Sequence, residues 1–78
     1  MIHVKYFASL REQLGRAEDH ISAEGVATVA DVWAHANGNA PMPSNMLMAV
    51  NMEYSNRDSA VKDGDEIGFF PPVTGGRQ

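Results

Sequence analysis

The amino-acid sequence predicts an α+β domain in which a mixed sheet is covered by helices on one face. Three segments have the period-2 alternation or the short apolar runs that are typical of strands, at residues 2–8, 46–54 and 66–70. Two others have helical spacing of apolar residues, at residues 9–14 and 28–37. With a weaker strand at 17–23, the order is strand, helix, strand, helix and then three strands, which favours a sheet with an antiparallel component.

The first strand places different side chains on its two faces. One face carries Ile2, Val4 and Tyr6, and the other carries His3, Lys5 and Phe7. Phe7 therefore adds a large ring to an otherwise polar face. Ser9 and Glu12 have the spacing of a capping box, which predicts that the first helix begins at Ser9. Gly15 is suited to the left-handed residue that ends this helix.

The second helix is predicted at Thr28–Asn37, with Thr28 as its N-cap. Its buried stripe consists of Val29, Val32, Trp33 and Ala36. We expect Trp33 to be buried against the apolar faces of the first and last strands, at Ile2, Val4 and Ile67. Gly38 ends the helix, and Asn39–Asn45 forms a loop.

The second half of the sequence predicts three strands joined by turns. A buried strand is expected at Leu47–Val50, followed by a turn at Asn51 and a short returning strand that contains Tyr54. The turn Asp63–Asp65 precedes the last strand, Glu66–Phe70. In that strand Ile67 and Phe69 face the core, whereas Gly68 and Phe70 face the other side. Pro71 and Pro72 then end the strand because proline cannot donate a ladder hydrogen bond.

Length and composition limit the classes of function. With 78 residues, the chain is expected to form a single small domain without room for an enclosed substrate pocket. The formal net charge of −4, with no basic cluster, argues against nucleic acid and anionic membranes as partners. The absence of cysteine excludes disulfides and a thiol nucleophile. No apolar run is long enough to span a membrane and no signal peptide is recognisable, so we expect a cytoplasmic domain.

The usual catalytic side chains do not form a recognisable constellation. The three histidines are His3, His20 and His35. They lie far apart without metal-ligand spacing, which predicts no metal site. The acidic group is Asp63, Asp65 and Glu66, and it is interpreted as a solvated turn. Met42, Met46 and Met48 are interpreted as core residues, with a soft contact surface as the alternative. The domain is therefore expected to be non-catalytic on its own and to bind no cofactor.

The C-terminal segment carries the most information about function. Two prolines hold the chain extended beyond the last strand, and the six residues 71–76 can reach about 20 Å. Gly75 and Gly76 lack a Cβ and can pass through a channel too narrow for other residues. Taken by itself, a Gly-Gly pair near a terminus is also typical of a frayed chain end.

A resemblance to a known family decides between these interpretations. Asp63-Gly-Asp-Glu-Ile-Gly-Phe-Phe-Pro-Pro-Val-Thr-Gly-Gly76 resembles the C-terminal signature of molybdopterin synthase small subunits, which are ubiquitin-like sulfur carriers. The opening Ile2-His-Val-Lys-Tyr-Phe-Ala-Ser-Leu-Arg-Glu12 and the strand end Ala49-Val-Asn51 are similar to that family as well. The resemblance implies a β-grasp domain at residues 1–72 and a C-terminal tail at residues 73–78.

The resemblance also implies how such a chain acts. In that family an E1-like enzyme uses ATP to adenylate the terminal glycine carboxylate, and a persulfide sulfurtransferase supplies the sulfur of a thiocarboxylate. The tail then enters the large subunit of a heterotetrameric synthase, and the sulfur is transferred to cyclic pyranopterin monophosphate in molybdenum cofactor biosynthesis. Gly76, preceded by Gly75, is the matching residue. The alternatives are a sulfur carrier for another pathway, such as thiamine thiazole synthesis, and a ubiquitin-like interaction module without sulfur chemistry.

One departure from the family pattern concerns the last two residues. Arg77 and Gln78 follow Gly76, which therefore has no free carboxylate in the 78-residue chain. The extra residues are consistent with processing, with a cloning artefact, or with loss of carrier function. We expect the 78-residue form to be inactive as a carrier until both residues are removed.

A partner surface is predicted from the strand faces. Because the first and last strands are neighbours in a β-grasp sheet, Phe7 and Phe70 should form one exposed patch, joined by Tyr54. The tail segment continues this predicted interface with the large subunit through Pro71, Pro72, Val73 and Thr74.

Overall fold

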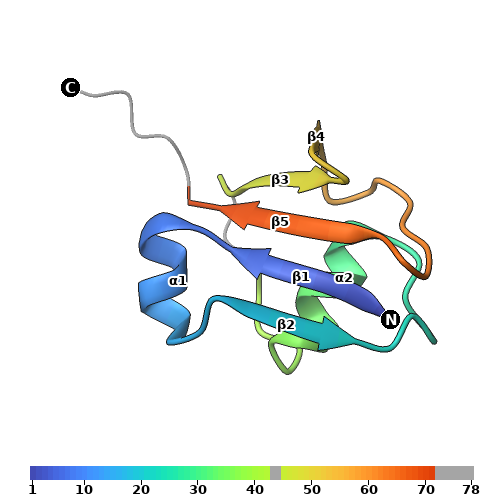
Figure 1. Cartoon of the computed structure of the whole chain (residues 1–78), viewed down its shortest axis with the longest axis horizontal. Helices are drawn as coiled ribbons and strands as arrows, with labels where there is room; N and C mark the ends of the chain where they lie inside the picture. The colour runs from blue at the N-terminus through green and yellow to red at the C-terminus, as the bar shows by residue number, and fades with distance from the viewer. Residues whose placement is uncertain (43–44, 72–78) are drawn as a thin grey trace.

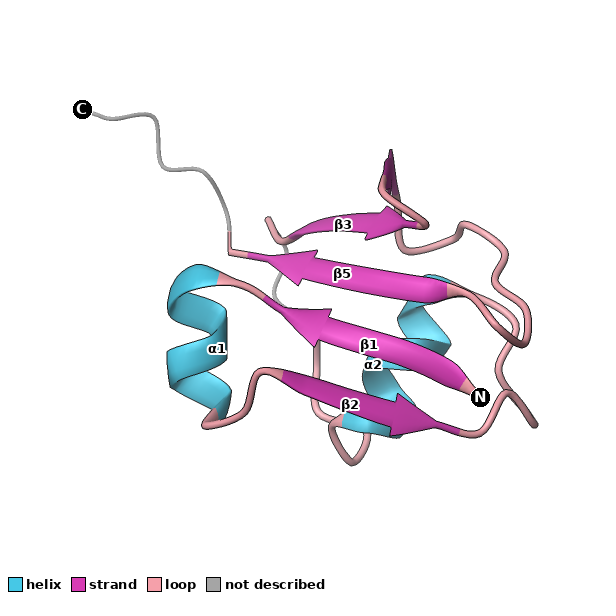
Figure 2. Cartoon of the chain, viewed as in Figure 1, coloured by secondary structure: helices cyan, strands magenta, loops and turns pink. Residues whose placement is uncertain are grey.

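The computed structural model describes residues 1–42 and 45–71 of the chain. These residues form one five-stranded sheet with two helices (Figures 1 and 2). The elements in chain order are β1 (Ile2–Tyr6), α1 (Ala8–Leu14), β2 (Glu18–Ile21), α2 (Val29–Ala36), β3 (Leu47–Val50), β4 (Glu53–Ser55) and β5 (Glu66–Phe70). The predicted α+β class and element order are therefore confirmed. No helix in the described ranges is long and apolar enough to cross a membrane.

The strands lie in the order β2-β1-β5-β3-β4, so the first and last strands are central neighbours. β1 and β5 pair in parallel, and Tyr6 lies opposite Phe69 in their register. The other pairings, β1 with β2, β3 with β5 and β3 with β4, are antiparallel. This is the mixed sheet of a β-grasp fold, and it brings the chain back beside its own N-terminal strand before the tail begins (Figure 1).

Helix α2 covers one face of the sheet and supplies much of the core (Figure 2). Trp33 is 4 % exposed, which confirms that it is buried. Its ring packs edge-on against Phe69, at 5.2 Å between centroids, and against Tyr6, at 6.3 Å. The predicted neighbours, Ile2, Val4 and Ile67, are fully buried in the same cluster. Burying one large apolar side chain stabilises the fold by about 1.5–3 kcal/mol, so this face holds the domain together.

The predicted N-cap of α2 is confirmed. Thr28 has extended backbone, and its Oγ1 accepts a hydrogen bond from the Asp31 amide at 3.3 Å. In return, Asp31 Oδ2 accepts from the Thr28 amide at 3.1 Å and from the Ala27 amide at 3.0 Å. The backbone hydrogen bonds from Ala27 and Thr28 lower the pKa of the Asp31 carboxyl. The cap satisfies amides that the first turn leaves without helical partners.

The predicted start of α1 is wrong. The helix begins at Ala8, and Phe7 occupies the N-cap position without a side-chain cap. The Phe7 amide donates to the Phe69 carbonyl at 3.1 Å, so Phe7 remains tied to β5 and the chain must turn directly after it. Ala8 makes this turn with φ of 54°, before Ser9 can act as a cap. The end of the helix is as predicted, because Gly15 is left-handed with φ of 73°.

The turn before β5 also differs from its prediction as a solvated acidic group. Asp65 is 5 % exposed and therefore buried. Its carboxylate accepts hydrogen bonds from Asn51 Nδ2 at 3.0 Å and from the amide and Nζ of Lys62 at 2.9 and 3.0 Å. The hydrogen bonds from Asn51 and Lys62 lower the pKa of the Asp65 carboxyl. Asp65 thus fastens the turn after β3 to the start of β5, which is a structural role.

Candidate functional site

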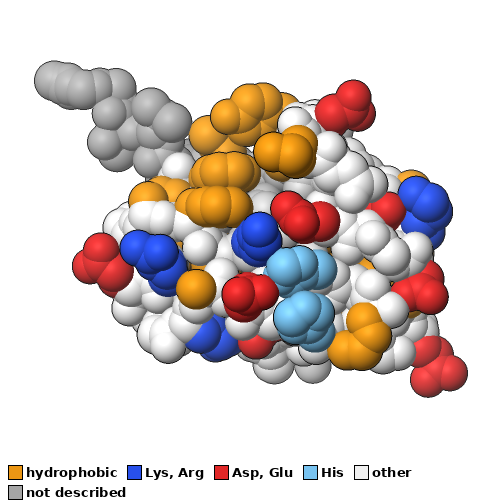
Figure 3. Space-filling model, viewed as in Figure 1, with side chains coloured by type: hydrophobic (Ala, Val, Ile, Leu, Met, Phe, Trp, Pro, Cys, Tyr) orange, Lys and Arg blue, Asp and Glu red, His pale blue; other side chains and the backbone are white. Residues whose placement is uncertain are grey.

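The open face of the sheet carries an exposed aromatic patch, which we define as Phe7, Phe70 and Tyr54. Phe7 and Phe70 stack with their ring centroids 4.6 Å apart and their planes 7° from parallel. The Tyr54 ring lies 6.3 Å from Phe70 at a tilt of 55°. Phe7 is 37 % exposed and Tyr54 is 78 % exposed. In Figure 3, hydrophobic side chains gather on this face at the end of β5.

Gly68 allows the two phenylalanine rings to meet. It lies on β5 next to both rings, and a Cβ built on Gly68 would stand 3.2 Å from Phe7 Cε2 and 3.4 Å from Phe70 Cε1. The first distance is shorter than ordinary van der Waals contact and the second is at its lower limit, so a side chain at this position would require the Phe7 ring to shift by a few tenths of an ångström. The sequence predicted that Gly68 and Phe70 lie on the same face of the strand. It did not predict that Gly68 leaves the space that the two rings occupy.

Two further apolar residues extend the patch, and the sequence did not identify them. Leu47 lies directly opposite Phe70 in the β3–β5 register and is 38 % exposed. Met52, in the tight turn between β3 and β4, is 91 % exposed. Together with Phe7, Tyr54 and Phe70, Met52 borders a shallow depression of about 190 Å³. A depression with aromatic walls on an exposed sheet face is suited to receive a partner's apolar side chain.

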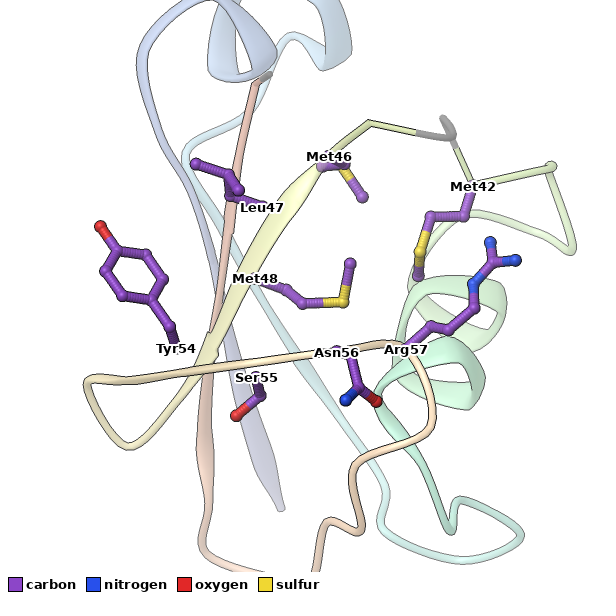
Figure 4. Close-up of a pocket in the computed structure, with 8 residues that line it drawn as sticks. All are labelled: Met42, Met46, Leu47, Met48, Tyr54, Ser55, Asn56 and Arg57. Carbon is purple, nitrogen blue, oxygen red and sulfur yellow. The ribbon is translucent and has the colours of Figure 1, made fainter. Parts of the chain in front are cut away.

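A larger open cleft of about 460 Å³ lies next to the patch, between β3 and the segment after β4 (Figure 4). Its walls are Met42, Met46, Leu47, Met48, Tyr54, Ser55, Asn56 and Arg57. Met46 and Met48 are buried in the core, as predicted, and Met42 packs against them. No Asp, Glu or His belongs to these walls in the part of the chain that the structure describes. The cleft walls therefore offer thioether, hydroxyl, carboxamide and guanidinium groups, but no carboxylate or imidazole for acid–base chemistry.

The last described residue, Pro71, lies at the edge of the patch. Phe70 is the last residue of β5, and Pro71 follows it with its side chain half-buried. The predicted site residues Pro72, Val73, Thr74, Gly75 and Gly76, with Arg77 and Gln78, lie outside the described residues. Of the predicted partner interface, the structure brings together Phe7, Tyr54 and Phe70, with Pro71 next to them. The predicted boundary between domain and tail also falls outside the described residues.

The prediction that the histidines lie far apart is wrong for two of them. His3 on β1 and His20 on β2 are direct partners in the antiparallel register, and their rings stack at 4.4 Å. Glu18 lies beside them, whereas His35 is on α2. Sequence spacing missed this cluster because cross-strand pairing, which the sequence does not show directly, creates it.

Comparison with known proteins places the chain in a family. The model of the ThiS family matches residues 4–76, so the match ends at Gly76. The chain belongs to the ThiS family. Among the curated relatives of this ThiS-family chain, the molybdopterin synthase sulfur carrier subunit of Haemophilus influenzae is 41 % identical, covering 97 % of this chain and 100 % of the relative. The protein of the same name from Escherichia coli is 36 % identical with the same coverage.

Solved structures agree with the fold of this ThiS-family chain. SAMP1 from Haloferax volcanii superposes with a TM-score of 0.79 at 28 % identity, covering 96 % of this chain and 98 % of SAMP1. A chain in the BexX/CysO complex of Amycolatopsis orientalis superposes with a TM-score of 0.62 at 27 % identity, covering 97 % and 100 %. The second structure is a complex between two different proteins, which shows that a similar fold binds a protein partner. The predicted β-grasp fold is thereby confirmed.

Proposed function

We propose that this ThiS-family chain is the sulfur carrier subunit of a molybdopterin synthase and holds sulfur as a thiocarboxylate on Gly76. The observation that carries the proposal is the 41 % identity to the Haemophilus influenzae sulfur carrier subunit over the whole of that relative. The family match that ends at Gly76 supports the choice of residue. The chain has no cysteine, which agrees with a sulfur atom held on the backbone rather than on a side chain.

The proposed chemistry needs a free carboxylate at Gly76 and no side-chain catalyst from this chain. An E1-like partner transfers AMP from ATP to the carboxylate, and pyrophosphate leaves. The terminal sulfur of a persulfide donor then attacks the acyl adenylate and displaces AMP, which leaves Gly76 joined to the donor through an acyl disulfide. A thiol cleaves this S–S bond, forms a disulfide with the donor sulfur, and releases the thiocarboxylate. The thiocarboxylate reaches cyclic pyranopterin monophosphate inside the large subunit, so ATP is used by the activating enzyme and the carrier itself needs no cofactor.

Arg77 and Gln78 must be removed before this chemistry can occur. The peptide carbonyl between Gly76 and Arg77 offers no carboxylate oxygen to attack ATP. The Arg77 side chain would also have to lose its hydration to enter a channel shaped for glycine, and burying an unpaired charge is costly. The carrier form is therefore the chain that ends at Gly76.

A mass measurement tests this proposal. Three forms of the chain, ending at Gln78, Gly76 and Thr74, are incubated with the E1-like enzyme, ATP, a persulfide donor and a thiol reductant. The form ending at Gly76 should gain about 16 Da, the difference between sulfur and oxygen, and the other two should not change. A form ending at Gly76 that gains no mass would contradict the carrier function. Equal gain by the form ending at Gln78 would contradict the assignment to Gly76.

We further propose that the aromatic patch binds the large subunit. Phe70 in the patch is six residues before Gly76, so a partner seated on the patch would be within reach of Gly76. Stacked, exposed rings over a glycine bury a large apolar area on docking, and aromatic residues are enriched among the residues that dominate binding energy. The same surface would suit the E1-like enzyme, which must also reach Gly76.

The second candidate function is a ubiquitin-like modifier or interaction module without sulfur chemistry. The superposition on SAMP1, described in a second crystal structure as small archaeal modifier protein 1, is the observation that favours it. A carrier for thiazole synthesis is the alternative within sulfur chemistry. The mass assay separates a carrier from a module, and supplying the cyclic pyranopterin or the thiazole precursor to the thiocarboxylate form separates the two carriers.

A further inference from the structure

A second cluster lies on the open face of the sheet, away from the aromatic patch, and the proposed function does not use it. We call it the histidine cluster and define it as His3, Glu18 and His20. His3 and His20 face each other across the antiparallel β1–β2 pair, and Glu18 is two residues before His20 on the same strand face. Figure 3 shows two histidines side by side between acidic side chains on this face.

The three side chains already point at a common space. One possible ligand atom from each lies within 4.8 Å of the others. His3 Nε2 is 2.5 Å from Glu18 Oε1, and the two imidazole rings are nearly parallel, 7° apart. Ligands of a tetrahedral zinc ion lie about 3.3–3.5 Å from one another, given bond lengths of about 2.0–2.2 Å. Small rotations of exposed side chains on rigid strands would reach that geometry.

The surroundings also favour a cation. His3 Nδ1 lies 3.8 Å from Glu66 Oε1 on the neighbouring β5. Each ring nitrogen of His3 therefore has a carboxylate nearby, Glu18 at Nε2 and Glu66 at Nδ1. A carboxylate behind a metal-bound imidazole fixes the ring and raises its basicity. Lys5, whose Nζ is 3.9 Å from Glu66 Oε2, is the one positive side chain among these residues. With neutral imidazoles, Glu18, Glu66 and Lys5 leave one net negative charge around the cluster.

We propose that the histidine cluster binds a divalent transition-metal ion of the Zn²⁺ type through His3, Glu18 and His20. Two imidazoles and one carboxylate are a donor set that suits Zn²⁺ and leaves a fourth position for water or a partner's ligand. The ion would join β1 to β2, an edge strand, and would place a positive charge on the same face as the aromatic patch. This inference does not depend on the sulfur carrier function.

The experiment is a calorimetric titration of the 78-residue chain with ZnCl₂ at about pH 7.5, with Zn²⁺ up to about 1 mM. Zn²⁺ is used as the probe rather than Cu²⁺. Cu²⁺ and Ni²⁺ favour planar sets of nitrogen ligands, which the backbone at a chain's N-terminus can supply, so they could bind there instead of at the histidine cluster. We expect saturable binding of one ion per chain and a higher melting temperature in its presence. Titration at about pH 5 should abolish binding, because protonated imidazoles cannot bind a metal.

Matched variants identify the ligands. His20→Phe keeps a ring stacked on His3 but removes the nitrogen, and it should weaken Zn²⁺ binding by about tenfold or more. Glu18→Gln should also weaken binding, and His35→Ala, on the exposed side of α2, should leave it unchanged. Absence of saturable binding to the parent chain would overturn the proposal. Binding that survives both His20→Phe and Glu18→Gln would place the ion elsewhere and would overturn it equally.

Discussion

Two aromatic pairs lie where β1 and β5 end, and the residues of one pair directly follow those of the other in the sequence. Tyr6 and Phe69 are partners in the parallel β1–β5 register, with centroids 6.1 Å apart, and they are 2 % and 0 % exposed. Phe7 and Phe70 follow them directly, stack at 4.6 Å, and lie on the open face. The chemistry of the pairs is nearly identical, so their different roles come from the side of the sheet on which they lie.

The comparison teaches how a small domain separates stability from binding. The buried pair contacts Trp33 of α2, so its rings belong to the core. The exposed pair lies next to Gly68, and in the described part of the chain no helix covers its face of the sheet. A shift of one residue in the β1–β5 register would exchange the two faces, which means that the core fixes the register and thereby places the patch.

The largest expected effect is loss of stability on truncation of the buried pair. Phe69→Ala removes a fully buried ring from contact with Tyr6 and Trp33, and it should lower the free energy of unfolding by about 3–5 kcal/mol. Urea unfolding followed by the fluorescence of Trp33, the single tryptophan, measures this loss. Because such a loss is comparable to the whole stability of a domain of this size, Phe69→Leu provides a milder variant that should still fold. Unfolding curves of Phe69→Leu and parent that coincide would show that the buried face does not carry the stability.

Truncation of the exposed pair should affect binding instead. Phe70→Ala should weaken binding to the large subunit by about 2 kcal/mol, roughly thirtyfold in Kd, and Phe7→Ala should act similarly because the rings stack on each other. Calorimetric titration of the large subunit measures both, with His35→Ala on the exposed side of α2 as the control. Unchanged affinity in variants that remain folded would remove the patch from the interface.

The third effect concerns Asp65, which fastens the turn after β3 to the start of β5, at the opposite end of β5 from the two aromatic pairs. In Asp65→Asn, an NH₂ group replaces one of the two carboxylate oxygens. An NH₂ group in the place of Oδ2 cannot accept the hydrogen bond that the Lys62 backbone N–H donates, so at pH 7 the substitution should cost about 1–2 kcal/mol of stability. The folded-state pKa of Asp65 is lowered, so its contribution is present above the unfolded pKa near 4 and is lost as pH falls through the folded pKa. The two proteins should therefore become equally stable in strong acid, as chemical unfolding at several pH values would show.

The matched control for Asp65 is Asp58→Asn, the same substitution on an exposed residue. We expect it to change stability by less than about 0.5 kcal/mol at any pH. A constant difference between parent and Asp65→Asn across the acid range would mean that shape rather than charge makes Asp65 important.

Features that depend on local patterns could be predicted from the sequence. Alternation along β1 and β5 identified which side of each strand is buried, because neighbouring residues of a strand point to opposite faces. The N-cap at Thr28 and the left-handed Gly15 were also predictable, since caps depend on a few adjacent residues. The resemblance of the C-terminal segment gave the neighbouring positions of the first and last strands and hence the patch.

Features that depend on pairing between distant segments were missed. The apparent cap at Ser9 fails because Phe7 is bound to β5. Asp65 is buried because Asn51, fourteen residues away, and Lys62 close over its carboxylate. His3 and His20 meet because β1 and β2 pair in a register that places them opposite each other. In each case the local sequence is compatible with the observed structure, but the partner that decides it lies elsewhere in the chain.

The smallest expected effect concerns Met52, at the edge of the patch, and tests whether this side chain lowers stability while it contributes to binding. Asn51 and Met52 form the two-residue turn between β3 and β4, with φ of 51° and 72°. Such a turn favours glycine at its second position. A residue with a side chain costs about 1–2 kcal/mol of stability in the left-handed backbone conformation. Glycine avoids this cost, but its greater backbone freedom in the unfolded chain lowers the stability by about 0.5–1 kcal/mol. Met52→Gly should therefore raise stability by about 0.5–1 kcal/mol and, because it removes a 91 % exposed side chain from the rim of the patch, weaken binding to the large subunit. Thermal unfolding and titration of the same variant measure both effects, and a variant that gains stability without losing affinity would show that Met52 is not part of the interface.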